Sequence, residues 1–182
     1  NHYKNEIGYL PQREEIDWTF PVSALDVVCM GSYRRSGWFK KVSNEEKEKG
    51  RIALQRMGIE SLSNRPIGEL SGGQQQRVFI SRILLQNAKV VFMDEPFTGV
   101  DATTEKIISN ILKELVEENK TVISVHHDLQ TVADYFDHIV FINLRVIDSG
   151  PTKTVFTKEN LKKTYGGRLT VLDQVSTSFK KR

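Results

Sequence analysis

Three stretches of the chain are largely apolar over the length of a β-strand. They are the runs 89–93, 121–125 and 138–142, which read Lys-Val-Val-Phe-Met, Thr-Val-Ile-Ser-Val and His-Ile-Val-Phe-Ile. Runs without strict alternation are typical of strands that are buried on both faces of a parallel sheet. The segment 7–12 reads as the end of a further strand, because Pro11 cannot donate a hydrogen bond to a central ladder.

Helical periodicity separates these strands. The pairs Phe79/Ile83 and Ile80/Leu84 are four residues apart, which predicts a helix with one apolar face. A second helix is predicted over 107–115, where apolar residues recur at intervals of three and four. From residue 89 on, the order is strand 89–93, helix 107–115, strand 121–125, a short helix over 129–135 and strand 138–142. This order implies right-handed crossovers and an α/β fold with a parallel sheet.

Helix-capping residues mark two further helices in the first half of the chain. Ser23 with Asp26, and Ser43 with Glu46, have the spacing of an N-terminal cap. Gly31 is predicted to end the first of these helices and Gly58 the second. The second helix is predicted to bury an apolar face made of Ile52, Leu54 and Met57.

The last third of the chain continues with shorter elements. We expect a short helix over 129–135 after the second apolar strand, and an antiparallel strand from about 143 to 150 after the third. A terminal helix is predicted over 158–165 and is stopped by two glycines.

Composition narrows the class of protein. The chain has 182 residues, of which 38% are hydrophobic and 27% charged, as in a soluble globular domain. A net charge of +3 is too small to indicate nucleic-acid binding, and no nucleic-acid partner is expected. A single cysteine, Cys29, excludes an internal disulfide and favours a reducing compartment, and no apolar run is long enough to cross a membrane.

The run Leu70-Ser-Gly-Gly-Gln-Gln-Gln-Arg77 is the most specific feature of the sequence. Ser71 is a good N-cap residue for the helix that follows. Gly72 and Gly73 carry no side chains that would block access to the backbone amides at the start of that helix, where an anion binds favourably. A flexible turn is the alternative for Ser-Gly-Gly alone. The full run resembles the signature motif of the ATP-binding cassette (ABC) ATPases.

Polar residues follow two of the predicted strands. Asp94 and Glu95 come directly after 89–93, and His126-His127-Asp128 follows 121–125. Ligands bind beyond the carboxyl ends of the strands in an open parallel sheet. Phosphoryl transfer needs a carboxylate for Mg²⁺, a second acidic group that orients water, and a donor for the terminal phosphate. Acidic residues that only favour solubility are the alternative for Asp94 and Glu95.

Together, these motifs resemble those of the ATP-binding cassette (ABC) ATPases over essentially the whole chain. The resemblance implies a P-loop NTPase-like sheet flanked by helices, with an inserted helical sub-domain, and ATP with Mg²⁺ as cofactors. It implies catalytic roles for Glu95 and for the switch histidine His127. It also implies that Mg²⁺ binds at the Walker B aspartate Asp94 and at Gln12, the glutamine of the Q-loop. The other residues that it implies for nucleotide binding are Ser71, Gly72, Gly73, Gln74 and the D-loop Asp101.

Two departures from the family pattern are present. His126 stands where threonine is frequent, and His127 is favoured as the switch because it precedes Asp128-Leu129. No Gly-x-x-x-x-Gly-Lys-Ser/Thr run occurs. The family has this P-loop upstream of the position of Gln12. The expectation is therefore the C-terminal portion of one ABC domain, inactive alone and binding ATP weakly or not at all.

That expectation divides the chain into parts. The helical sub-domain would span 13–88 and carry the signature motif, the RecA-like core would comprise 1–12 and 89–150, and 151–182 would form the C-terminal helix and tail.

The stretch 9–23 and the stretch 155–167 resemble ATP-binding subunits of bacterial manganese, zinc or iron importers. The resemblance implies integral membrane permease subunits as partners, a second ATPase subunit in a head-to-tail dimer, and a substrate-binding protein indirectly. It also implies a peripheral location on the cytoplasmic face of a bacterial membrane. Candidate anchors for the permease are the aromatic residues of the segment 13–41: Trp18, Phe20, Tyr33, Trp38 and Phe39.

Two alternatives stay open on the sequence. A chromosome-maintenance or repair ATPase shares the motifs, but would be expected to carry a coiled coil between Gln12 and Ser71, where the chain has no heptads. A non-catalytic binding module without a P-loop is the other.

Overall fold

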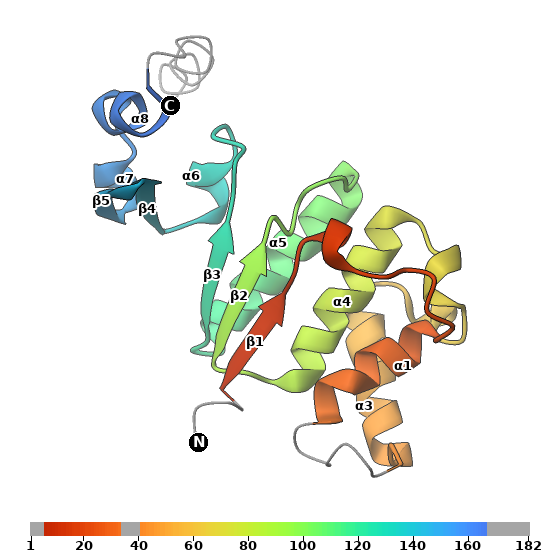
Figure 1. Ribbon diagram of the computed structural model, residues 1–182. Coiled ribbons are helices and arrows are strands. Elements are labelled where there is room, and N and C mark those ends of the chain that lie inside the picture. The colour runs from red at the N-terminus through yellow and green to blue at the C-terminus, as the bar shows by residue number, and fades with distance from the viewer. Residues whose placement is uncertain (1–5, 34–40, 167–182) are drawn as a thin grey trace. The chain divides into compact units, whose positions relative to one another are not determined.

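The computed structural model describes residues 6–33 and 41–166, which fall into two compact units, 1–125 and 126–182. The first unit is built on a parallel sheet of β1 (Ile7–Leu10), β2 (Val90–Asp94) and β3 (Thr121–Val125), in that order (Figure 1). Leu10 is paired with Met93, and Asp94 with Val125. The three strands therefore end close to one another, and the segments after them emerge at one edge of the sheet.

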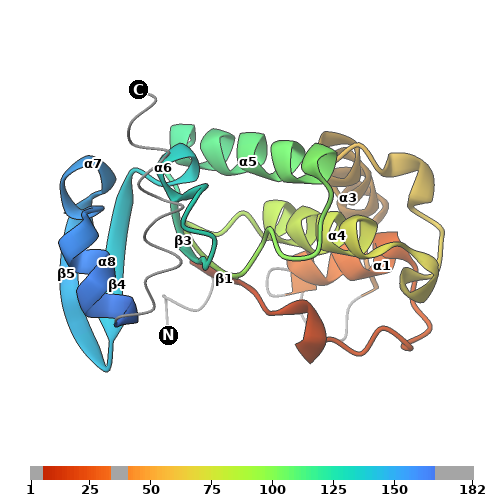
Figure 2. The same ribbon diagram turned by 90° about the horizontal axis from the view of Figure 1, so that it is seen from above.

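Two helices cover one face of this sheet. They are α4 (Gly72–Gln86), which packs against β1, and α5 (Ala102–Glu117), which packs against β3. The two helices lie side by side in Figure 2. The strand residues that face them, Leu10, Val91 and Met93, are at most 2% exposed.

The opposite face of the sheet is apolar and accessible. Tyr9, Phe92 and Ile123 form a row across the three strands and are 50%, 38% and 46% exposed. The prediction that these strands are buried on both faces is therefore wrong for the described part of the chain, because α4 and α5 pack on one face only.

A helical layer joins the sheet through α4. It contains α1 (Ala24–Cys29) and α3 (Asn44–Arg56), which pack on each other and on α4. Four short 3₁₀ turns complete this region: η2 (Arg13–Glu15), η3 (Met30–Ser32), η4 (Glu60–Leu62) and η5 (Ile67–Glu69). One continuous core of buried apolar side chains fills the space between the helices and continues to the sheet.

The predicted helix caps are confirmed. Ser23 with Asp26, and Ser43 with Glu46, each form a reciprocal capping box in which side chain and backbone satisfy one another. Gly58, after α3, has a φ of 69°, the left-handed conformation that suits a helix end. The prediction for Ile52 is wrong, because this residue is 49% exposed, whereas Leu54 and Met57 are fully buried.

The role predicted for Gly31 is also wrong. The helix α1 ends at Cys29, and Gly31 lies within η3. A Cβ atom at Gly31 would lie 2.4 Å from the backbone oxygen of Arg82 in α4. Glycine is needed here because two backbones approach closely, and not because a helix ends.

The second unit is an antiparallel hairpin with three short helices. β4 (His138–Asn143) pairs with β5 (Arg145–Pro151), and the helices are α6 (Val132–Tyr135), α7 (Thr152–Val155) and α8 (Lys158–Tyr165). Its small core includes Phe141 stacked on Phe156, with ring centroids 6.2 Å apart.

The expected order of strands therefore holds, but the pairing of β4 does not. β4 is hydrogen-bonded to β5 in a two-stranded sheet of the second unit, and the chain turns between these strands at Leu144. Within the described residues, no helix combines the length and the apolar character needed to span a bilayer.

Candidate functional site

Ser71 caps the start of α4, as the sequence predicts. The Ser71 hydroxyl accepts a hydrogen bond from the Gln74 backbone N–H at 3.4 Å, and the Gln74 side-chain oxygen accepts one from the Ser71 N–H at 2.9 Å. This capping box fixes the first turn of the helix, where the amide groups and the helix dipole favour a negative charge. It leaves the Gln74 side chain turned back onto the cap.

The two glycines of this loop are closely flanked by other segments. A Cβ atom at Gly72 would lie 3.1 Å from the Arg13 guanidinium carbon, and one at Gly73 would lie 3.2 Å from the Thr104 hydroxyl. Arg13 follows β1 and Thr104 lies in the first turn of α5. Glycine at these two positions therefore avoids close contacts with neighbouring segments.

Arg13 makes a contact with Gln75 that the sequence analysis did not predict. Its Nε and Nη2 donate to the side-chain oxygen of Gln75 at 3.2 and 3.0 Å, while the Gln75 amide nitrogen donates to the Ile67 carbonyl at 3.1 Å. Gln75 is 3% exposed, so its polar groups are satisfied inside the protein. This contact joins the segment after Gln12 to the helix that carries the Ser71–Gly73 loop.

Asp94 is the last residue of β2 and has an oxygen that suits a cation. One carboxylate oxygen, Oδ1, is buried and accepts no hydrogen bond from the described residues. A buried carboxylate oxygen without a partner is costly, and Mg²⁺ would supply the missing interaction. Gln12 leaves β1 at the same sheet edge, and its amide oxygen is a second suitable ligand.

Asp94 and Gln12 do not make a complete protein cage. Within 6–33 and 41–166, no three His, Cys, Asp or Glu side chains are grouped closely enough to hold a metal ion. Mg²⁺ is commonly held by one or two protein oxygens together with phosphate oxygens and water. The residues present therefore fit a magnesium ion that arrives with a nucleotide.

Glu95 follows in an uncommon backbone conformation, with a φ of 47°. Its backbone N–H donates to the Val125 carbonyl at 3.2 Å, and its carbonyl accepts from the Thr98 N–H at 3.1 Å. The Thr98 hydroxyl donates to the carboxylate at 3.1 Å. A non-glycine residue is held in this region only where its surroundings enforce it, and such residues cluster at functional sites.

Asp101 has a clear structural role at the start of α5. Its carboxylate accepts from the Thr104 backbone N–H at 2.8 Å, and this hydrogen bond lowers the pKa of Asp101 below its usual value. The charge of Arg77, from α4, acts in the same direction.

The predicted residues of the first unit lie at the ends of its strands and the starts of its helices. They are Gln12 after β1, Asp94 with Glu95 at the end of β2, Ser71 to Gln74 at the start of α4, and Asp101 at the start of α5. His127 belongs to the second unit, so its assignment as the switch stays a prediction. His126 instead has a local partner, with Nε2 and the Thr131 hydroxyl 2.8 Å apart.

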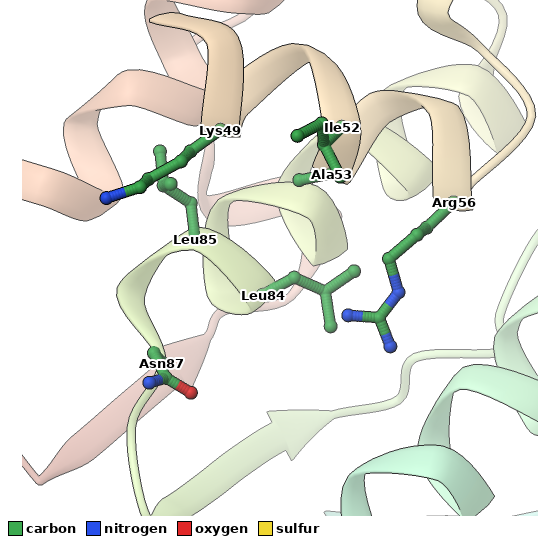
Figure 3. A pocket seen from close by; sticks show the side chains of 7 residues that line it. All are labelled: Lys49, Ile52, Ala53, Arg56, Leu84, Leu85 and Asn87. Atoms are coloured by element: carbon green, nitrogen blue, oxygen red, sulfur yellow. The ribbon is translucent and has the colours of Figure 1, made fainter. Parts of the chain in front are cut away.

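A separate groove lies between α3 and α4. It has a volume of about 300 Å³ and contains none of the predicted site residues (Figure 3). The side chains that line it are Lys49, Ile52, Ala53, Arg56, Leu84, Leu85 and Asn87.

Comparison with known proteins agrees with this geometry. The family model described as ABC transporter matches residues 1–98. The manganese transport system ATP-binding protein MntB of Bacillus subtilis is 56% identical over 169 residues, which are 93% of this chain and 68% of that protein. This chain belongs to the ABC transporter ATP-binding family. The predicted P-loop NTPase-like fold class is confirmed with it.

Other relatives and structures of this family support the assignment. The zinc transport system ATP-binding protein TroB of Treponema pallidum is 49% identical over 91% of this chain and 62% of its own length. A metal-chelate type ABC transporter in an inward-facing conformation superposes with a TM-score of 0.80 at 28% identity, covering 88% of this chain and 63% of that one. A nucleotide-free ATP-binding cassette has a TM-score of 0.69 at 26% identity, covering 97% of this chain and 69% of that one. The chain spans about two thirds of the length of these relatives.

Proposed function

We propose that this ABC chain is part of the ATP-hydrolysing subunit of an importer for a divalent metal ion, manganese, zinc or iron. The proposal rests mainly on Asp94, which has a buried carboxylate oxygen without a hydrogen-bond partner among the described residues. Glu95 follows it directly, and the Ser71–Gly73 loop belongs to the same unit. The names of the manganese and zinc relatives support the choice of cargo.

Four residues of this chain would have separate roles in ATP hydrolysis. Glu95 would accept a proton from the attacking water, and Asp94 with Gln12 would hold Mg²⁺, which neutralises charge on the phosphates. His127 would donate a hydrogen bond to the terminal phosphate.

The Ser71–Gly73 loop would contact the terminal phosphate of ATP bound to the P-loop of a second subunit. The complete site would then form between two subunits. Closure on ATP and opening after hydrolysis would move permease subunits at the cytoplasmic face of the membrane, to which a substrate-binding protein delivers the ion.

Glu95→Gln in the full-length subunit tests this assignment. The variant keeps the size of the side chain but cannot act as a base, so turnover is expected to fall by about 100-fold or more. ATP-driven dimerisation, measured by size-exclusion chromatography, should persist. Undiminished hydrolysis would contradict the role of Glu95.

The cargo requires a separate measurement. Uptake of radioactive manganese, zinc and iron by cells with and without the transporter would identify the ion. We expect the Glu95→Gln variant to lose uptake of one of these ions while permease levels stay unchanged. If the variant takes up all three ions as the parent does, the proposed cargo class is contradicted.

A further inference from the structure

Gln76 connects the signature helix to the loop that carries Glu95. It lies in the second turn of α4, and its side chain is 6% exposed. The amide nitrogen donates to the backbone carbonyl of Pro96 at 3.1 Å. Pro96 comes directly after Glu95, so a single buried hydrogen bond reaches across 20 residues of sequence to the chain beside the proposed base.

The Glu95 loop depends on such contacts. The φ of 47° at Glu95 is unfavourable for a residue with a side chain, so the conformation persists only if neighbouring contacts hold it. One contact is the bond from the Glu95 N–H to Val125, and a second is the bond from the Thr98 N–H to the Glu95 carbonyl. The Gln76 side chain, which comes from α4, holds the carbonyl of the next residue, Pro96.

The other end of this connection is the signature loop. Gln76 is three residues after Gly73, which is less than one helical turn. A continuous helix is stiff over this length, and its start is fixed by the capping box at Ser71. Displacement of the Ser71–Gly73 loop would therefore move Gln76 and the carbonyl that it holds.

We propose that Gln76 is a positioning residue that sets the backbone of Glu95 and couples it to the signature loop. The inference rests on the proposed ATPase function. One helix then links the loop that meets one nucleotide to the glutamate that acts on the other. Gln76 itself touches neither substrate.

The test uses the full-length subunit with its permease. Gln76→Met keeps the length of the side chain and removes both N–H donors, so the Pro96 carbonyl loses its partner. We expect kcat for ATP hydrolysis to fall by about 10- to 100-fold, because small displacements of a catalytic group have effects of this size, with KM for ATP changed by less than about twofold. Gln76→Asn, whose shorter side chain cannot reach Pro96, is a second variant with the same expectation.

Gln86→Met is the matched control. Gln86 lies in the same helix, and its amide nitrogen donates to the Ile7 carbonyl at 2.8 Å, far along α4 from Glu95. The control also loses a side-chain to backbone bond from the same helix, although this bond is exposed whereas that of Gln76 is buried. Because the lost bond does not hold the Glu95 segment, kcat should stay within about twofold of the parent. Urea unfolding of all variants establishes that each is folded under assay conditions.

A double-mutant comparison separates positioning from general destabilisation. If Gln76 acts through Glu95, Gln76→Met should not lower the residual rate of Glu95→Gln any further. Equal fractional losses in both backgrounds would overturn the inference, and so would an unchanged kcat in Gln76→Met. Failure of the ATPase proposal is distinguishable, because the parent protein would then show no Glu95-dependent hydrolysis.

Discussion

The contact between Arg13 and Gln75 allows a quantitative test of how the Q-loop segment is held to the signature helix. Two N–H groups of Arg13 donate to one oxygen of Gln75, at 3.2 and 3.0 Å. Arg13→Met removes these donors and leaves a buried oxygen without them. Gln75→Met removes the oxygen as well as the bond to Ile67.

The magnitudes follow from burial. Hydrogen bonds from a charged donor contribute about 1.5–3 kcal/mol when buried, and the exposure of Arg13 places this one at the lower end. We expect Arg13→Met to lower the free energy of unfolding by about 1–2 kcal/mol and Gln75→Met by roughly 2 kcal/mol, since it loses a second bond. The double variant should lose about 1 kcal/mol less than the sum, because the pair can be lost only once.

Urea titration of the full-length subunit, followed by circular dichroism, measures these values. Lys89→Met is a suitable control, because its ion pair with Glu6 has side chains that are 74% and 38% exposed and should contribute less than about 1 kcal/mol. The coupling would be refuted if the losses of unfolding free energy in the two single variants added up to the loss in the double variant. It would also be refuted if Arg13→Met lost no unfolding free energy.

Two further predictions concern the helical layer. Gly31→Ala should lower the free energy of unfolding by about 1–3 kcal/mol, because its Cβ would meet the Arg82 backbone oxygen at 2.4 Å. Gly8→Ala should lower it less, because the nearest atom to a Cβ there is 3.4 Å away. Equal unfolding midpoints of the two variants would contradict this prediction. Burial raises the pKa of the Cys29 thiol to about 11, so about one thiol in a thousand is ionised at pH 8. Labelling by a disulfide reagent should therefore be slow in the folded protein, speed up as pH rises toward 11, and be fast in urea; rapid labelling of the native protein at pH 8 would contradict the burial of Cys29.

Local chemistry explains why much of the fold could be predicted. The capping pairs at Ser23 and Ser43 act over three residues, and the runs 121–125 and 158–165 coincide with β3 and α8. The same holds for the signature loop, where Ser71 caps its own helix. These features depend on neighbours in the sequence, which pattern reasoning can see.

The errors concern contacts between distant residues. The sequence cannot state that the backbone of Arg82 lies against Gly31. The burial of Gln76 could have been suspected, because it lies four residues before Ile80 on the apolar face of α4. The hydrogen bond from Gln76 to Pro96 could not have been predicted, because the sequence around either residue does not indicate the other.

Gly72 and Gly73 show why functional effects in the signature loop need structural controls. Access of phosphate to the helix amides would by itself explain both glycines. A Cβ at Gly72 would also press on Arg13, and one at Gly73 on Thr104, which follows the Asp101 cap. An alanine at Gly72 meets the Arg13 guanidinium, which could move away only by weakening its hydrogen bonds to Gln75. An alanine at Gly73 meets a β-branched side chain in the first turn of α5, which has little rotamer freedom. Loss of activity at Gly73 would therefore report displacement of Thr104 together with loss of phosphate access, and loss at Gly72 would report disturbance of the Arg13–Gln75 contact together with loss of access. The free energy of unfolding of each alanine variant has to be measured beside its activity to separate the two effects.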